Sequence, residues 1–264
     1  MSIHAGLFSR TSEAGTVRAL VRLAPFNLAS ALLVLAAVVA GGTAGYLLWA
    51  AAFALEWVTP LVTGIGGFRI APGHFVERHG LVVIVALGES VVAIGIGAAG
   101  QPVDLALVSV AVLGLVLAAC LWWAYFGGDD SRAEEALAAV PEDRRAAVAV
   151  RAFGYWHLPI LLGIVALAAG LKDAIGHAFE PLDLNHALLL AGGVATFLAG
   201  DLGFRRILDL GPARHRAAAA VLALATIPAG LAVSAVLQLT ALGIVLCGCL
   251  AAESSTAWSR GRRS

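Results

Sequence analysis

The chain has 264 residues, of which 60% are apolar and only 13% are charged, and its mean hydropathy is strongly positive. A soluble domain carries about twice that charged fraction. The hydrocarbon core of a bilayer, by contrast, demands few charges because it cannot solvate them. The composition therefore excludes a soluble globular protein. The formal net charge of zero indicates no class of partner by itself, and we expect lipid and no nucleic acid as the surroundings.

Eight apolar segments are long enough to cross a bilayer, whose core of about 30 Å requires about 20 helical residues. Pro25 opens the first segment, in a position that suits the first turn of a helix. The predicted fold is an all-α, polytopic transmembrane helix bundle. The predicted spans are residues 25–41, 44–65, 78–98, 104–126, 153–171, 186–204, 215–232 and 235–253.

The last two spans come from a single apolar stretch, residues 217–252, which is 36 residues long. As one helix it measures about 54 Å, nearly twice what a bilayer requires. Pro228 and Gly230 lie near its middle. We therefore predict a tight hairpin there.

The basic residues give an independent test of this division into spans. Of the 17 Lys and Arg residues, 16 fall in the two termini and in every second connection. Lys172 alone falls in the connections of the other set. Cytoplasmic loops collect Lys and Arg, so both termini are predicted to lie in the cytoplasm. The chain is expected to cross the membrane several times.

This topology divides the chain into a cytoplasmic segment (1–24), a transmembrane domain (25–253) and a basic cytoplasmic tail (254–264). Residues 8–24 fit an interfacial basic helix or a solvated entry segment equally well. The longest polar connection, 127–152, intersperses acidic and basic residues. It is predicted to hold a short pair of cytoplasmic helices.

Glu89 is the clearest candidate functional residue, because it lies about half-way along the predicted span 78–98. A carboxylate there is expensive, so it should be protonated, paired or facing a wet cavity. Its neighbours Gly88 and Ser90 allow close backbone approach and supply a hydroxyl. Two interpretations stay open: a proton or cation site, and a protonated Glu bonded to a neighbouring helix.

Three further ionisable residues are secondary candidates. Asp201 lies four residues before Arg205, so the two are expected to form an ion pair on one helix. Glu56 could line the cavity of Glu89 or reach the interface. His157, at the entrance of the fifth span, favours a hydrogen-bonded structural role over that of a ligand. The cysteines (Cys120, Cys247 and Cys249) are expected to be small buried hydrophobes, and no metal site or cofactor is predicted.

The block HFVERHGLVVIVALGESVVAIG, residues 74–95, closely resembles the signature of the bacterial low temperature requirement A (LtrA) family of integral membrane proteins. The resemblance implies insertion in the bacterial cytoplasmic membrane but brings no settled reaction. Members usually begin with further spans that open on a segment like ELFFDLVFV, and this chain is expected to lack them. Other stretches agree in order: 21–37, 121–126, 155–171 and 204–206.

The favoured hypothesis is an ion-linked or proton-linked transporter or channel in which Glu89 binds the ion. A charged cluster of His74, Glu77, Arg78 and His79 begins the same helix. Twelve residues of helix, about 18 Å, separate Glu77 from Glu89. The cluster is therefore predicted to form a cytoplasmic gate.

Two alternatives stay open. The first is a membrane-embedded enzyme that acts on a lipid or another amphiphile, with His79 and Glu77 as an acid–base pair. The absence of a nucleophile or metal motif speaks against this enzyme. The second is a non-catalytic scaffold or sensor, in which bulky substitutions of Gly88 or Gly95 disrupt helix packing. The oligomeric state is left open.

Overall fold

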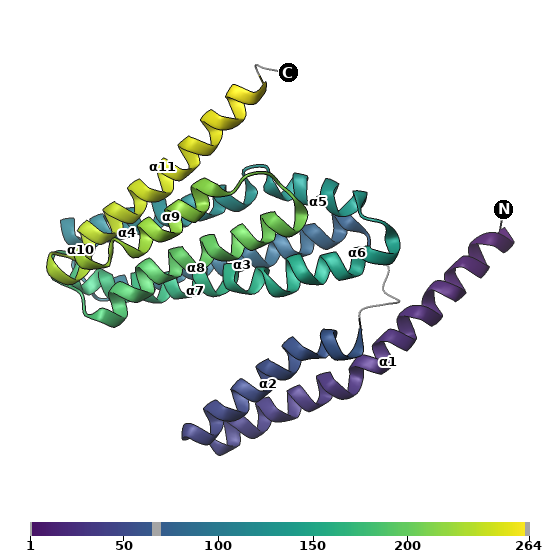
Figure 1. The fold of residues 1–264 in the computed structure, drawn as a ribbon. Helices are drawn as coiled ribbons and strands as arrows, with labels where there is room; N and C mark the ends of the chain where they lie inside the picture. The colour runs from purple at the N-terminus through teal and green to yellow at the C-terminus, as the bar shows by residue number, and fades with distance from the viewer. Residues whose placement is uncertain (1, 65–69, 262–264) are drawn as a thin grey trace. The chain divides into compact units, whose positions relative to one another are not determined.

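The computed structural model describes the backbone of residues 2–64 and 70–261 and the side chains of residues 21–64 and 70–255. These residues form helices and connections, without a strand (Figure 1). Residues 65–69 and 262–264, including Arg69, Arg262 and Arg263 of the charge argument and the predicted end of the second span, lie outside this description. Contacts divide the chain into two units, residues 1–71 with 140–149 and residues 72–139 with 150–264.

The first unit is a helical hairpin of α1 (Ser2–Ala40) and α2 (Gly42–Thr63), with the short helix α6 (Glu142–Ala149). Gly41 and Gly42 make the turn with φ values of 59° and 48°, a region that favours glycine. Pro25 lies inside α1 and not in its opening turn. The expected start of the first span is therefore wrong, because one continuous helix already runs through residues 8–24.

The second unit is a bundle of long helices joined by short ones. Asp104 and Asp183 begin two of its helices by accepting hydrogen bonds from the backbone N–H groups of Leu107 and His186, at 3.0 and 2.9 Å. The elements are α3 (Pro72–Ala98), α4 (Leu105–Phe126), α5 (Asp129–Ala139), the π-helix η1 (Val150–Tyr155), α7 (His157–Ala174), the 3₁₀ turn η2 (Ile175–His177), α8 (Leu184–Leu208), α9 (Arg214–Leu224), α10 (Ile227–Ala232) and α11 (Ala235–Gly261).

Eight helical segments of the described residues are long and apolar enough to cross a membrane, as the sequence predicts. The last hairpin turns between the predicted spans 215–232 and 235–253, a few residues beyond Pro228 and Gly230. Pro228 is in the first turn of α10, and the chain reverses at Val233 and Ser234, just before α11. The reason is that a proline in the first turn needs no N–H partner and so does not end a helix. The short helix pair predicted in 127–152 is present as α5 and α6.

The core of the second unit is the antiparallel pair α7 and α8, which make the most extensive contact in the chain and lie side by side in Figure 1. Glycines on both helices permit this approach. A Cβ added at Gly163 would lie 2.4 Å from the Phe197 nitrogen, and one at Gly193 would lie 2.6 Å from the Leu167 nitrogen. The two backbones are therefore in contact. Membrane helices associate through such close van der Waals packing, because the hydrophobic effect does not drive them together within lipid.

A contact between α4 and α11 brings two cysteines together. The Sγ atoms of Cys120 and Cys247 are 3.7 Å apart. Cys120 and Cys249 are buried, whereas Cys247 is exposed, so the expectation of three buried thiols is wrong for Cys247. Its helix presents this face away from the bundle core, a choice that an apolar run does not reveal.

This proximity predicts an oxidative cross-link. Mild oxidation of the purified chain should join Cys120 to Cys247, because the sulfurs need to move by only about 1.7 Å to reach the disulfide bond length of roughly 2.0 Å. Peptide mass mapping after proteolysis checks the linkage. Cys249→Ser should leave it intact and Cys247→Ser should remove it. A dominant Cys247–Cys249 product would contradict the α4–α11 packing.

Candidate functional site

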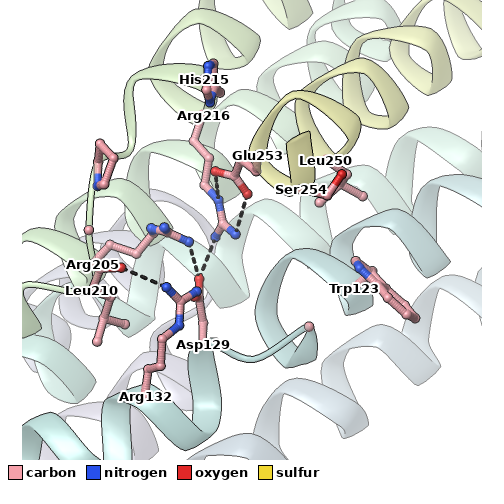
Figure 2. A pocket seen from close by; sticks show the side chains of 13 residues that line it. Trp123, Asp129, Arg132, Arg205, Leu210, His215, Arg216, Leu250, Glu253 and Ser254 are labelled. Atoms are coloured by element: carbon pink, nitrogen blue, oxygen red, sulfur yellow. Dashed lines mark hydrogen bonds and ion pairs between the residues drawn. The ribbon is translucent and has the colours of Figure 1, made fainter. Parts of the chain in front are cut away.

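A network of ion pairs joins four helices at one end of the second unit (Figure 2). Asp129 and Arg132 come from the start of α5, and Asp201 and Arg205 come from the last turns of α8. Arg216 begins α9 and Glu253 lies late in α11; these two complete the set. Residues more than a hundred positions apart in the sequence thus meet in one cluster.

Asp129 is the centre of this network. It accepts a hydrogen bond from Arg132 through one carboxylate oxygen and one from Arg205 through the other, which also forms an ion pair with Arg216. The Arg216–Asp129 distance is 3.1 Å. The Asp129 side chain is only 3% exposed, so its charge is compensated almost wholly by these guanidinium groups. The protein therefore fixes the start of α5 against α8 and α9 by electrostatics.

Arg216 links the remaining carboxylates. Its Nε and Nη2 atoms donate to the two oxygens of Glu253 at 2.9 and 3.0 Å, a bidentate pair, and its Nη1 donates to Asp201. Such fork-shaped pairing is the strong and geometrically specific mode of arginine. The expected Asp201–Arg205 ion pair is replaced, because each of these side chains finds a closer partner on another element.

The network forms the wall of a cavity of about 230 Å³. Trp123 and Gly127 line it from the end of α4, and Gly211, His215 and Ser254 line it from the segments around the network. Asp129, Arg132, Arg205, Arg216 and Glu253 also line it, whereas Asp201 does not. The cavity wall thus carries three guanidinium groups and one imidazole against two carboxylates.

Two atoms of this cluster lack a hydrogen-bond partner among the described residues. They are the Nε–H of Arg205 and one carboxylate oxygen of Asp201. Arg205 is 5% exposed and Asp201 is fully buried. An unsatisfied buried polar atom costs about 1–3 kcal/mol. The site therefore retains polar capacity that its own side chains do not use.

The charged cluster predicted at the start of α3 is divided by the structure. Arg78 Nε donates to His74 Nε2 at 2.9 Å, and His74 lies 3.8 Å from Glu77. These three side chains are on the exposed face. His79 points the other way, and its Nδ1 lies 2.8 Å from the Phe75 carbonyl oxygen. The acid–base pair of Glu77 with His79 is therefore not formed.

His79 belongs instead to a cluster of rings beside the π-helix η1. The His79 and His157 ring centroids are 5.6 Å apart, and Phe153, Tyr125 and Phe204 surround His157. His157 is 2% exposed. His157 is packed among aromatic rings, but neither of its ring nitrogens has a hydrogen-bond partner among the described residues, so the hydrogen bond expected of this residue is not found.

Glu89 lies on the exposed face of α3. This face also carries Arg78, Val85 and Val92, while the opposite face buries Val83 and others. Ser90 is fully buried, and its hydroxyl has no partner among the described residues. Gly88 has open space where a Cβ would stand, so the expected close backbone approach is wrong at this position.

Two other expectations are also resolved by position. Gly95 has no heavy atom within 4 Å of an added Cβ, so it does not serve as the packing contact expected of a scaffold. Glu56 is exposed on α2, in the first unit. Among the described residues, no three His, Cys, Asp or Glu side chains are grouped closely enough to hold a metal ion.

Sequence reasoning missed most of the ion-pair network. It singled out Asp201, but counted Arg216 only as a topology marker and did not consider Asp129 or Glu253. The available signal was weak: Arg216 and Glu253 each lie at the edge of an apolar run. Which charge meets which depends on the tertiary arrangement, and no spacing in the sequence encodes it.

Comparisons of the sequence with known proteins give matches that cover most of the chain. The model of a family described as bacterial low temperature requirement A protein (LtrA) matches residues 2–252. An uncharacterised protein of Rhizobium meliloti (strain 1021) is 30% identical over 169 residues, which cover 61% of this chain and 41% of that relative. The chain thus matches less than half the length of this curated relative. No solved structure matches.

Proposed function

We propose an ion-transport function for this chain, which belongs to the bacterial low temperature requirement A (LtrA) family of membrane proteins. In this proposal it moves a proton or small cation across the bacterial cytoplasmic membrane, with Glu89 as the ion-binding group. The observation that carries the proposal is the position of Glu89, a carboxylate among otherwise apolar exposed residues (81–96) of a helix long enough to cross a membrane.

The energetic argument starts from the cost of that carboxylate. An acidic side chain at the centre of a span costs roughly 2.5–3.5 kcal/mol on insertion scales. Valines occupy the neighbouring exposed positions, and no ion pair of Glu89 with a described residue accompanies this cost. A carboxylate with this insertion cost and without an ion pair to a described residue favours a role in binding a proton or cation.

The orientation follows from the basic residues of the second unit. Arg78, Arg132, Arg205 and Arg216 lie at the end that holds the ion-pair network, and Lys172 lies near the end of α7. By the positive-inside rule the network end faces the cytoplasm. The exposed His74, Glu77 and Arg78 cluster would then form the cytoplasmic approach to α3.

Glu89→Gln is expected to abolish the proton or cation flux of the wild type, because the amide neither binds a proton nor carries charge. The purified chain in liposomes that enclose a pH-sensitive dye should dissipate an imposed proton gradient, or admit Na⁺ or K⁺. Glu89→Asp should retain part of the flux. The measurement is the initial rate at matched protein content.

The matched control is Glu135→Gln, which removes an exposed carboxylate from α5 outside the apolar length of the spans. It should transport like the wild type. Equal flux for Glu89→Gln and the wild type would contradict the proposal. A wild-type flux no greater than that of empty liposomes for all three cations would contradict it too.

A further inference from the structure

The cavity at the ion-pair network has the chemistry of an anion site. Its carboxylates are already paired with arginines: Asp129 forms ion pairs with three guanidinium groups, and Glu253 accepts two bonds from Arg216. A cation entering the cavity would therefore have to compete with arginines. The unused capacity among the lining residues belongs to a donor, the buried Nε–H of Arg205.

Arg205 supplies the first donor. The residue is 95% buried, lines the cavity, and carries an Nε–H without a partner among the described residues. Its Nη1 is bonded to Asp129, which holds the guanidinium plane in place. A guanidinium already fixed in orientation loses little freedom when it binds an oxyanion.

His215 supplies the second donor. It lies one residue before Arg216, is half-buried, and lines the same cavity. An imidazole can donate an N–H in either protonation state. Arg214 is exposed on the neighbouring segment, where its charge raises the local concentration of anions.

The volume restricts the ligand. The cavity of about 230 Å³ exceeds the roughly 30 Å³ share of one water molecule several-fold, and so admits a tetrahedral oxyanion. We propose that this cavity binds a phosphate group, with Arg205 and His215 as its donors. The group is either free phosphate or the headgroup of an anionic phospholipid, and the site stands independently of ion flux through Glu89.

The test measures binding to the purified full-length chain in a neutral detergent. Inorganic phosphate, compared with chloride at equal ionic strength, should raise the thermal unfolding midpoint with a saturable dose response. Phosphatidic acid in mixed micelles, compared with phosphatidylcholine, forms the second arm. Saturation by inorganic phosphate identifies a soluble ligand, and saturation by phosphatidic acid alone identifies a lipid headgroup.

Two variants probe the donors. Arg205→Lys keeps the charge beside Asp129 but removes the Nε–H, and His215→Gln removes the imidazole from a half-exposed position. Each should weaken the apparent affinity at least about tenfold, which corresponds to 1.4 kcal/mol. Arg206→Gln, on the next residue of α8 and outside the cavity lining, should leave the affinity within about twofold.

Three outcomes would overturn the proposal. The first is the absence of a saturable shift with either ligand in the folded wild type. The second is an equal loss of affinity in Arg206→Gln and in both donor variants, which would indicate surface charge only. The third is unchanged affinity in Arg205→Lys and His215→Gln. Proton or cation flux is measured separately, so its failure leaves these results interpretable.

Discussion

Gly193→Val is expected to prevent the second unit from folding. The Cβ of any residue at this position would lie 2.6 Å from the Leu167 nitrogen and 2.8 Å from the Gly163 carbonyl oxygen. Both atoms are backbone, so no side chain can rotate to make room. Helices α7 and α8 would have to separate along the contact that forms the core of the unit.

The size of this effect exceeds that of an ordinary core substitution. Overpacking a core costs about 1–3 kcal/mol when side chains absorb it, and more when a backbone must move. We expect Gly193→Ala to lower the free energy of unfolding by an amount at or above the upper limit of this range. We expect Gly193→Val to yield no folded protein. Unfolding by SDS titration in mixed micelles, followed by helical circular dichroism, measures both.

Gly192→Ala is the matched control. It is the adjacent residue on α8, and an added Cβ there meets no heavy atom within 4 Å. Alanine also improves helix propensity by up to about 1 kcal/mol. The variant should therefore be as stable as the wild type or slightly more stable. Equal destabilisation at both positions would mean that α7 and α8 do not pack as closely as described.

The helices themselves could be predicted from the sequence because their signals are local. Span length and apolar composition identify eight segments, and the described part of the chain contains eight such helical segments. The errors fall where local signals compete. Pro25 appeared to open a helix, yet α1 runs through it, because the residues on both sides also favour helix.

The candidate site was predicted less completely, for a physical reason. Glu89 could be found because its own surroundings in the sequence are apolar, and Asp201 for the same reason. The actual partner of Asp201 could not be found in this way. Arg205 lies within i,i+4 reach of Asp201 in the sequence, whereas Arg216 meets Asp201 only because two helices pack together. Likewise His79 and Glu77 are close in sequence, but they face opposite sides of α3.

The glycines show the same division between local and tertiary information. Gly163 and Gly170 on α7, and Gly193 and Gly200 on α8, are each seven residues apart, which places each pair on one helix face. The sequence thus contains two glycine faces. Only the structure shows that these faces meet, and that Gly88 and Gly95 on α3 meet nothing.

Asp129→Asn is the second substitution from which we expect a large loss of stability. The carboxylate of Asp129 is the partner of Arg205 and Arg132 and lies 3.1 Å from Arg216. The amide keeps the shape but removes the charge. Arg205, which is 5% exposed, would keep a buried positive charge without an ionic partner. Breaking a buried pair in this way costs about 3–5 kcal/mol.

A double-mutant cycle separates this charge effect from simple loss of contact. Arg205→Met alone leaves Asp129 with two of its arginines, and the double variant Asp129→Asn with Arg205→Met removes the unpaired cation. If the pair is coupled, the double variant should be more stable than the sum of the single losses predicts.

Asp130→Asn, one residue along α5 and half-buried, is the control and should remain within about 0.5 kcal/mol of the wild type. SDS unfolding curves measure the four proteins of the cycle and the Asp130→Asn control. Strictly additive losses would show that the network at the end of the bundle is a set of independent contacts. A positive coupling would instead show that α5, α8 and α9 are held as one unit around the cavity, which a fixed site for an anion requires.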